Sequence, residues 1–505
     1  MLALTGLTPF YQNCAFSSRS SGVSTDAYSS NGNNVDLGGL YVHPKSEGLC
    51  PDGDINEMKI RYESGVPVLI RDKCTDLSVE EQLQVRVDAD PSDSSFIVYN
   101  GAIFVDSHSF FRESAVDRTG AVYSIATQIS LSNREKFTFV AKIDPQGARV
   151  WTKRLRTDQT QELTSIRVLK SGNVLLAGRA EIEATSWGLI VVLAPDGQTF
   201  WARAFASAPA TVPVFSDADA DSAGNIYVTG ELRSTKGLPT ESFVMKLNPK
   251  GEVLWQTALA SENGWLNKIR VSIDGLDVYA AGNLAGNGQT PGGVLKLASI
   301  NGTLVWSRVF PSVVYALREA HDGGVTFAGA HAQSNMNIIA KLTPSATLAF
   351  ATQFQSAGDS LSSVRGLTER PDGSYLASGV ALRSTIGLVG TVSSLTAQGS
   401  LEWSFQYRRT GYDAFQSGHT DLVNGKAWIA ALTSTPDGQQ LGSLLQIEDS
   451  SEQTRCRLCT IQSDLSSTSM DLPSKAGPKP RAVQLFSSVP IFLELGTFQI
   501  KPEIR

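Results

Sequence analysis

The residues closest to a metal-binding pattern are Asp217-Ala-Asp219-Ala-Asp221-Ser-Ala-Gly224, with carboxylates at alternate positions ahead of a glycine. Calcium loops use alternate oxygen ligands in this way and end in a glutamate at position 12. Val228 stands at that position here, and Asp221 also fits a turn that recurs along the chain. Calcium therefore stays a secondary interpretation, and we expect no cofactor.

The five cysteines favour structural roles. Cys50 and Cys74 bracket a loop short enough for a disulfide, which would stabilise by about 3 kcal/mol. Cys456-Arg-Leu-Cys459 has CxxC spacing, but zinc sites use a second such pair and redox sites a βαβ context. We interpret Cys456 and Cys459 as strand cysteines or as a second disulfide.

Motifs for nucleophilic or metal-assisted catalysis are missing from the sequence. Gly358-Asp-Ser-Leu361 spells a hydrolase tetrapeptide outside any α/β context, and no G-x-S-x-G, H-E-x-x-H or P-loop occurs. None of the five histidines pair at metal-ligand spacing: His43, His108, His321, His331 and His419. We predict a non-enzymatic protein without catalytic residues.

The amino-terminal residues resemble a bacterial lipoprotein signal. Residues 2–10 are apolar, Cys14 follows, and residues 15–34 are rich in Ser, Gly and Asn, a composition typical of a flexible tether. Two features depart from that pattern: no basic residue precedes the apolar stretch, and the residues before Cys14 are large. We interpret residues 1–39 as a signal and tether with Cys14 as the lipidation site. The alternative is an ordinary amino terminus.

Composition limits the function classes further. The chain has 505 residues, 41% hydrophobic and 18% charged, with a formal net charge of -6. A nucleic-acid binder would normally show a basic patch or domain. No run of 18 or more apolar residues predicts a membrane-spanning helix. Export would fit a disulfide and a cell-envelope location, whose side of the outer membrane stays open.

The elements that would position any site come from an internal repeat. Its first half is a glycine turn followed by an apolar strand, and the glycines recur every 49 to 52 residues: Gly120, Gly172, Gly224, Gly275, Gly324, Gly373 and Gly425. In four copies a second glycine is predicted to end that strand: Gly178, Gly230, Gly282 and Gly379.

The second half of the repeat is a strand, a tight turn and an aromatic residue. Val244-Met-Lys-Leu-Asn-Pro-Lys-Gly251 leads to Trp255 in this way. The aromatic residue recurs in six units: Trp151, Trp201, Trp255, Trp306, Phe350 and Trp403. The seventh unit is degenerate and lacks it. A repeated tryptophan in the outermost strand is predicted to pack between neighbouring units rather than to bind a ligand.

Each unit is predicted to hold four strands, which in the second unit are residues 164–169, 173–181, 189–194 and 199–205. One such unit cannot bury both faces alone, so neighbouring units must stack. Seven units of about 50 residues predict an all-β fold, a seven-bladed β-propeller of four-stranded blades, over residues 108–461.

This unit resembles that of bacterial seven-bladed β-propeller repeat proteins, D-x-x-G-N-x-Y-V-x-G followed by K-L-x-P-x-G-x-x-x-W. Residues 221–230 match the first half at nearly every position, and Lys246 to Trp255 match the second. The second half is also similar to the tryptophan-docking repeat of quinoprotein-like propellers, including outer-membrane assembly lipoproteins, which usually have eight blades. The resemblance implies a fold, and function does not follow from it.

Two further segments flank the repeats. Residues 40–107 are predicted to form a small β segment, with strands near 59–62, 66–70 and 83–87 and a hairpin at Asn100-Gly101. This segment is either a separate domain or a plug against the propeller. Residues 462–505 form an extension that packs on the propeller or pairs with the amino-terminal segment.

The binding candidates lie in the longer connections. In a propeller the turns between first and second and between third and fourth strands share one face, and here they are tight and uniform. The second-to-third loops and the links between units share the other face and vary, as recognition loops do. The candidates there are Trp187, Arg233, Lys236, Trp265, His331, Tyr407, Arg408, Arg409, Tyr412 and Phe415, each of which could equally be a solvated loop residue. Asn335 and Asn337 share the loop of His331.

Arginines recur in the first strands, which are expected to line the axis: Arg112, Arg167, Arg270, Arg318 and Arg365. Salt bridges to neighbouring acids are favoured over an anionic ligand. Our leading hypothesis is a lipid-anchored envelope or surface scaffold that binds a protein or glycan. The alternatives are a propeller enzyme (lyase, hydrolase or quinone-dependent oxidoreductase) and an outer-membrane assembly scaffold.

Overall fold

The computed structural model describes residues 107–407 except for short gaps, namely 131–135, 146–148, 157–160, 183–184, 208–210, 235–238, 260–263, 285–291, 357–358 and 384–386. Outside that body it describes mainly strands, which lie between residues 57 and 100 and between 412 and 496. No helix among the described residues is long and apolar enough to cross a membrane.

Six units of the repeat each form a four-stranded antiparallel blade, numbered here in chain order. Blade 1 contains β5 (Ser107–Val116), β6 (Val122–Ser130), β7 (Lys136–Ile143) and β8 (Arg149–Arg156). Blade 2 contains β9 (Gln161–Val168), β10 (Val174–Ile182), β11 (Thr185–Leu193) and β12 (Thr199–Ala206). Blade 3 contains β13 (Thr211–Ala220), β14 (Ile226–Ser234), β15 (Pro239–Leu247) and β16 (Val253–Leu259).

The next three blades repeat this order. Blade 4 contains β17 (Trp265–Val271), β18 (Asp277–Asn283), β19 (Gly292–Ala298) and β20 (Leu304–Phe310). Blade 5 contains β21 (Ser312–Glu319), β22 (Val325–His331), β23 (Asn337–Leu342) and β24 (Leu348–Ser356). Blade 6 contains β25 (Asp359–Glu369), β26 (Tyr375–Arg383), β27 (Gly387–Leu395) and β28 (Leu401–Tyr407).

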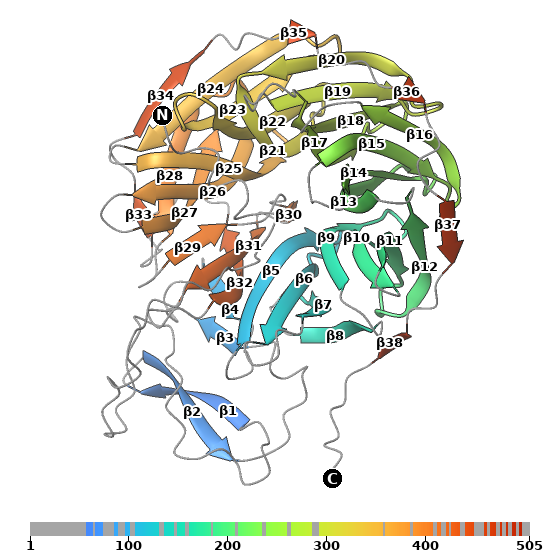
Figure 1. Cartoon of the computed structure of the whole chain (residues 1–505). Helices are drawn as coiled ribbons and strands as arrows, with labels where there is room; N and C mark the ends of the chain where they lie inside the picture. Colours follow the sequence, from blue (N-terminus) through green and yellow to red (C-terminus); the bar gives the residue numbers. More distant parts are fainter. Residues whose placement is uncertain are drawn as a thin grey trace.

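The blades are arranged around a central axis, with the first strand of each blade innermost (Figure 1). The all-β propeller of four-stranded blades is thus confirmed, and the strands of blade 2 fall within a few residues of their predicted bounds. Up-and-down order puts the turns that precede β6, β10 and their equivalents on one face, together with the turns that precede the fourth strands. We call this the tight-turn face, and we call the opposite one the loop face.

The degenerate seventh unit is built differently. Its strands β29 (Tyr412–Phe415), β30 (Asp421–Val423), β31 (Lys426–Ser434) and β32 (Gln440–Glu448) join two amino-terminal strands, β4 (Phe96–Asn100) and β3 (Val85–Asp88), in the order β29-β31-β32-β4-β3. The prediction of seven equivalent four-stranded blades is therefore wrong: six blades have that construction. The reason is that the described residues of the seventh unit include no fourth strand after β32, and β4 pairs with that edge of β32 instead.

The amino-terminal β segment is divided between two sheets. Strands β1 (Glu57–Glu63) and β2 (Val66–Lys73) form a hairpin that pairs with no other described strand. Strands β3 and β4 instead belong to the sheet of the seventh unit. Of the hairpin predicted at Asn100-Gly101, the second arm lies outside the described residues.

The carboxy-terminal extension surrounds the propeller. Its five short strands, together with β33 just before it, each add an antiparallel fifth strand to the outer edge of one blade, in reverse blade order from 6 to 1 (Figure 1). They are β33 (Cys459–Ile461), β34 (Leu465–Ser469), β35 (Lys475–Ala476), β36 (Arg481–Ala482), β37 (Ser487–Pro490) and β38 (Glu494–Gly496). Exposed strand edges invite pairing with other chains, so this outer belt also protects six edges.

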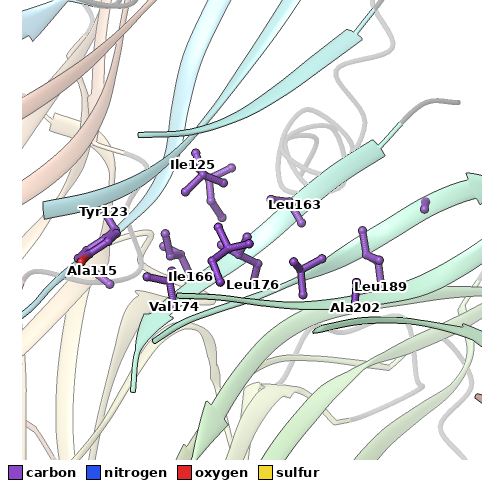
Figure 2. Close-up of a cluster of buried hydrophobic side chains, with 13 residues drawn as sticks. Ala115, Tyr123, Ile125, Leu163, Ile166, Val174, Leu176, Leu189 and Ala202 are labelled. Atoms are coloured by element: carbon purple, nitrogen blue, oxygen red, sulfur yellow. The ribbon is translucent and has the colours of Figure 1, made fainter. Parts of the chain in front are cut away.

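The hydrophobic core lies between blades. One cluster joins Ala115, Tyr123 and Ile125 of blade 1 to Ile166 and Leu176 of blade 2, all at most 3% exposed (Figure 2). Equivalent clusters join blades 2 and 3, 3 and 4, 4 and 5, and 5 and 6. Blades 2–5 therefore bury both faces against their neighbours, as the repeat predicted.

The repeated tryptophans tie each blade to the next, which confirms their predicted structural role. Trp151 of blade 1 donates its indole N–H to the carbonyl of Pro195 in blade 2, at 3.1 Å. Trp201, Trp255 and Trp306 make the same bond to the following blade, at 3.0 Å each. The glycine of the receiving turn allows this contact: a Cβ on Gly251 would lie 2.9 Å from the Trp201 ring.

The second repeated glycine has a different position from the one predicted. It lies within the second strand of blades 2–6, opposite a β-bulge in the innermost strand, and the fifth blade has it as Gly329. A Cβ on Gly230 would lie only 2.0 Å from the carbonyl oxygen of Val214. Glycine is needed because the bulge brings two backbones together.

Candidate functional site

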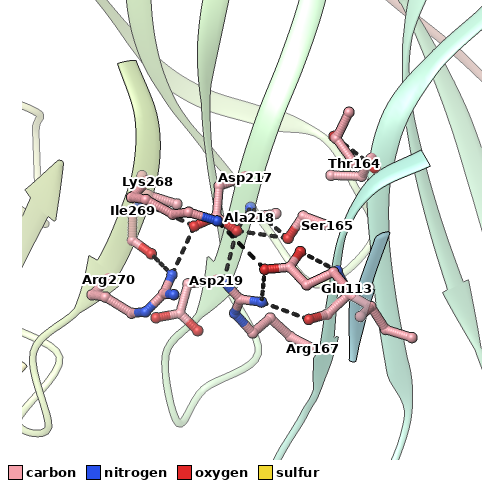
Figure 3. Close-up of polar contacts among 12 residues, drawn as sticks. Glu113, Thr164, Ser165, Arg167, Asp217, Ala218, Asp219, Lys268, Ile269 and Arg270 are labelled. Atoms are coloured by element: carbon pink, nitrogen blue, oxygen red, sulfur yellow. Dashed lines mark hydrogen bonds and ion pairs between the residues drawn. The ribbon is translucent and has the colours of Figure 1, made fainter. Parts of the chain in front are cut away.

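The bulges place charged side chains at equivalent positions around the axis. The residue after the bulge is Glu113 in blade 1, Asp217 in blade 3 and Lys268 in blade 4. Two residues further along are Arg167 in blade 2 and Arg270 in blade 4. Residues fifty or more positions apart in the chain therefore meet at the axis (Figure 3).

Asp217 is the centre of this polar network and is fully buried. One carboxylate oxygen accepts from Arg167 at 2.7 Å and from the hydroxyl of Ser165 at 2.6 Å. The other accepts from Arg270 at 2.8 Å and from the backbone N–H of Ile269 at 3.1 Å. Burial alone would raise the pKa of Asp217, but the two guanidinium groups hold it well below its usual range.

Glu113 completes the network on its other side. Its carboxylate accepts from the backbone N–H of Ile166 at 3.2 Å and lies 3.4 Å from Arg167 and 3.5 Å from Lys268.

The arginines of the network stay charged. Burial and the neighbouring Arg167 lower the pKa of Arg270 to about 10, so that this arginine stays charged at neutral pH. The cations and anions therefore compensate one another inside the protein.

The five arginines predicted to line the axis are thus held by protein groups. Arg112 pairs with Glu162, and Arg167 and Arg270 pair with Asp217, which confirms the predicted salt bridges for these three. Arg318 donates to the carbonyl of Leu367 at 2.9 Å, and the Arg365 guanidinium lies 3.6 Å from the centre of the Tyr315 ring. This arrangement favours inter-blade cohesion over an anionic ligand.

The aspartates of the calcium-like pattern have separate structural roles. Asp217 belongs to the arginine network, and Asp219 accepts from the backbone N–H of Val271 at 2.9 Å. Asp221 caps its turn by accepting from the N–H of Asn225 and the hydroxyl of Tyr227. Among the described residues no group of three or more histidines, cysteines or acids could hold a metal ion. The calcium interpretation is therefore not supported.

Glu319 gives the axis a pH-dependent group. Burial and the nearby Asp219, Asp274 and Glu369 raise its pKa to about 7, although the N–H of Ile273 bonds its carboxylate. Because the folded state holds this proton more tightly than the unfolded state, the contribution to stability is full below about pH 4.5 and is lost as the pH rises through about 7.

We expect Glu319→Gln, which reproduces the uncharged form, to raise the stability by about 1 kcal/mol at about pH 8 and to change little at about pH 4. Thermal melts of both proteins at the two pH values measure this difference. An equal effect at both pH values would contradict the assignment.

The loop face carries connections of very different length. Between second and third strands they range from two residues (183–184) in blade 2 to eight (284–291) in blade 4. The connection of blade 5, residues 332–336, is described in full. It contains Asn335 and is flanked by two other residues singled out from the sequence: His331, which ends β22, and Asn337, which begins β23.

The blade-5 loop is a compact hydrogen-bonded turn. The N–H of His331 donates to the carbonyl of Met336, and the N–H of Asn335 donates to the carbonyl of His331. Nδ1 of His331 accepts from the N–H of Ser334 at 3.3 Å and lies 3.1 Å from its hydroxyl. Burial lowers the pKa of His331, so its imidazole is neutral at pH 7. Asn335 has a φ of 57°, which asparagine tolerates better than most residues.

The loop also contacts the first strand of blade 6. The N–H of Ser362 donates to the carbonyl of Asn335 at 2.7 Å, and the hydroxyl of Ser362 accepts from the N–H of Asn337 at 3.0 Å. Ser312, the first residue of β21, lies opposite His331 in the sheet. The site is therefore built by four strands, β21, β22, β23 and β25, and one loop.

Three buried polar atoms of this site have no hydrogen-bond partner among the described residues: Ser312 Oγ, Asn335 Oδ1 and Asn337 Oδ1. Most buried polar groups in proteins are paired, and an unpaired one costs about 1–3 kcal/mol. We call Ser312, His331, Ser334, Asn335 and Asn337 the blade-5 site. It holds unpaired hydrogen-bond acceptors beneath the loop, next to a neutral imidazole.

The other predicted binding residues are scattered. Trp187 lies in β11 of blade 2, and its buried indole N–H also has no partner among the described residues. Trp265 begins β17, and Arg233 is paired with the buried Glu231 two residues earlier. These side chains do not join the blade-5 site.

Several residues predicted to have a role lie outside the described part of the chain or are placed only as backbone. Lys236, Arg408 and Arg409 lie outside the described residues, as do Cys14, Cys50, Cys74 and Cys456. Tyr407, Tyr412, Phe415 and Cys459 are placed only as strand residues of β28, β29 and β33. The link after blade 6 and the Cys50–Cys74 disulfide therefore stay predictions.

Sequence reasoning missed Ser312 and Ser362. Each begins or nearly begins an innermost strand, and each reaches the blade-5 loop only through the register of the sheets. The sequence did mark the loop part of the site, through the polar run from His331 to Asn337 in an otherwise apolar unit.

No protein-family model matches the chain, and no curated protein is significantly similar to it in sequence. Solved structures are similar to it in overall fold. The β-propeller domain of the Trilobed protease from Pyrococcus furiosus, described as having an open velcro topology, is 9% identical, has a TM-score of 0.42, and covers 69% of this chain and 98% of that one. Sqt1 from Chaetomium thermophilum is 10% identical, with a TM-score of 0.41 and coverage of 66% and 83%.

A third similar structure is a protein of unknown function from Dyadobacter fermentans. It is 12% identical, with a TM-score of 0.37 and coverage of 71% of this chain and 100% of that one. Similarity at this level transfers no activity or partner, so function must be argued from the residues of this chain.

Proposed function

We propose that this protein is a binding scaffold that holds a protein partner on its loop face, with the blade-5 site as a point of contact. The observation that carries the proposal is the set of three unpaired buried atoms at Ser312, Asn335 and Asn337. These atoms are closed to solvent in the free chain, so a partner reaches them only when the blade-5 loop opens. Pairing them then offsets a cost already present in the free protein, and that difference favours binding.

The chemistry of these atoms favours a peptide. The two amide oxygens can only accept hydrogen bonds, and backbone N–H groups are the donors that a polypeptide supplies repeatedly. A sugar hydroxyl both donates and accepts, so a glycan would leave part of its own capacity unused. The rigid sheets beneath the loop keep the acceptors in place, which lowers the entropic cost of association.

Location in the cell envelope is part of the proposal. It is supported by the pattern of residues 2–34, in which an apolar stretch, Cys14 and a Ser-rich segment follow one another. Mass spectrometry of the protein recovered from the native envelope tests it, because lipid on Cys14 adds a defined mass to the amino-terminal peptide.

Asn335→Gly tests the binding site itself. Glycine accepts a φ of 57° without strain and removes the unpaired oxygen, so we expect the fold to be kept and partner capture to fall about tenfold or more. Pull-down from the native envelope with quantitative mass spectrometry compares the variant with the natural protein.

Ala346→Gly is the matched control. Ala346 also has a positive φ, 65°, but lies in the turn before β24 on the opposite face. Capture should be unchanged in this variant. If Asn335→Gly captures the same proteins in the same amounts, or if a glycan panel binds and no protein does, the proposal is wrong.

A further inference from the structure

Strongly exposed apolar side chains gather at one end of the molecule. Among the described residues, seven large apolar side chains are more than half exposed, and all lie at the tight-turn face of blades 1–4: Val150, Phe200, Leu254, Ile273, Leu276, Ile300 and Val305. Four of them belong to blade 4. Ile300 is 82% exposed, Leu276 67% and Ile273 63%.

The two tight turns of blade 4 form one continuous surface. Residues 272–277 contain Ile273 and Leu276, and residues 298–303 contain Ile300. Ser299 joins the turns, because its N–H donates to the carbonyl of Leu276 at 2.9 Å and its hydroxyl donates to the carbonyl of Gly275 at 2.5 Å. We call Ile273, Leu276 and Ile300 the blade-4 turn patch.

The fold does not require this patch. Both blade-4 turns have one residue more than their counterparts, such as 221–225 and 248–252 in blade 3. Those counterparts have Ser-Ala and Pro-Lys at their tips, where blade 4 has isoleucines and a leucine. Because the other blades form equivalent turns from small or polar residues, the exposed aliphatic side chains need a reason other than folding.

Acidic groups border the patch. The carboxylate of Glu319 accepts from the N–H of Ile273, and Asp274 lies within the patch turn itself. Asp219 and Glu369 are close enough to act on Glu319 electrostatically. The lysines nearby are engaged elsewhere, since Lys296 pairs with Asp277 and Lys341 pairs with Asp322. At neutral pH the border therefore carries the negative charge of Asp274 next to apolar surface, and Glu319 adds to that charge as the pH rises above about 7.

We propose that the blade-4 turn patch is a second docking surface, which binds a segment of a protein partner that alternates aliphatic and basic residues. The aliphatic side chains of the partner cover Ile273, Leu276 and Ile300, and its lysines or arginines pair with the carboxylates at the border. A second copy of this chain would bring the same acids against one another, and like charges across an interface oppose association.

A synthetic peptide of alternating leucine and lysine is the probe, and a peptide of alternating leucine and glutamate is its counterpart. Isothermal titration calorimetry, in which each peptide is titrated into the full chain, measures the two affinities. We expect the lysine peptide to bind about tenfold or more tightly than the glutamate peptide, and to weaken as salt is added.

Variants locate the binding. The double variant Leu276→Thr, Ile300→Thr should weaken the lysine peptide about tenfold, and Asp274→Asn should weaken it severalfold. Phe200→Thr removes an apolar side chain that is 66% exposed on blade 2, and Asp372→Asn removes the equivalent exposed acid of blade 6, so both controls should bind like the natural chain.

Three results would overturn the proposal. The first is equal binding of the two peptides, or no binding of the lysine peptide. The second is an equal loss of affinity in Phe200→Thr and in the double variant. The third is self-association of the natural chain, measured by light scattering, that the double variant abolishes, because a second copy would then occupy the patch.

Discussion

Deletion of residues 1–106 is expected to abolish the cooperative unfolding of this protein. The deletion removes β3 and β4, and β4 pairs with β32 from Phe96 opposite Ile447 to Asn100 opposite Ser443. The sheet of the seventh unit contacts blade 6 through β29 and blade 1 through β31 and β32. Without β3 and β4 the edge of β32 is exposed, and the sheet that closes the ring between blades 6 and 1 is weakened.

We expect a loss of about 5 kcal/mol or more, which is comparable with the whole stability of many domains, and aggregation through the exposed edge. Differential scanning calorimetry and size-exclusion chromatography measure both effects. Deletion of residues 1–84 is the control, because it removes β1 and β2 and keeps β3 and β4. A monomer that lacks residues 1–106 and melts like the natural chain would show that β4 is dispensable.

The variant Asp217→Ala is expected to destabilise the propeller by about 3–5 kcal/mol, because it leaves Arg167 and Arg270 charged, buried and without their shared anion. Three blades meet at this carboxylate, so the variant weakens the packing of blades 2, 3 and 4 against one another. Chemical denaturation followed by tryptophan fluorescence measures the change.

Two comparisons separate charge from packing in this prediction. Asp217→Asn keeps the shape and removes the charge, so it should be nearly as damaging, whereas Asp372→Asn at an exposed turn should have little effect. Because the folded state lowers the pKa of Asp217, its contribution is present above about pH 4 and is lost as the pH falls further. If Asp217→Ala is as stable as the natural chain, the prediction is wrong, and Arg167 and Arg270 have found other partners.

Much of the fold is predictable because its unit is local. The turn glycines and the docking tryptophans recur at nearly constant spacing. Gly120, Gly172, Gly224, Gly275 and Gly373 take a positive φ, and the tryptophans of blades 1–4 bond to the following turn. In blade 5 the positive φ falls on Gly323, one residue before the predicted Gly324, and Phe350 stands in place of the tryptophan. Six of the blades follow from this pattern. The candidate site was predictable only in part, since its loop residues share one short segment but Ser312 and Ser362 come from separate strands.

The sequence by itself determined the repeat and the four strands of each regular unit. Only the tertiary structure decided which edges pair: β4 with β32, and β33 and the strands of the carboxy-terminal extension with blades 6 to 1. The physical reason is that turn glycines and apolar runs mark where each strand lies along the chain, while every backbone edge offers the same donors and acceptors. Which strand pairs with an edge therefore depends on which strand the tertiary fold places next to it.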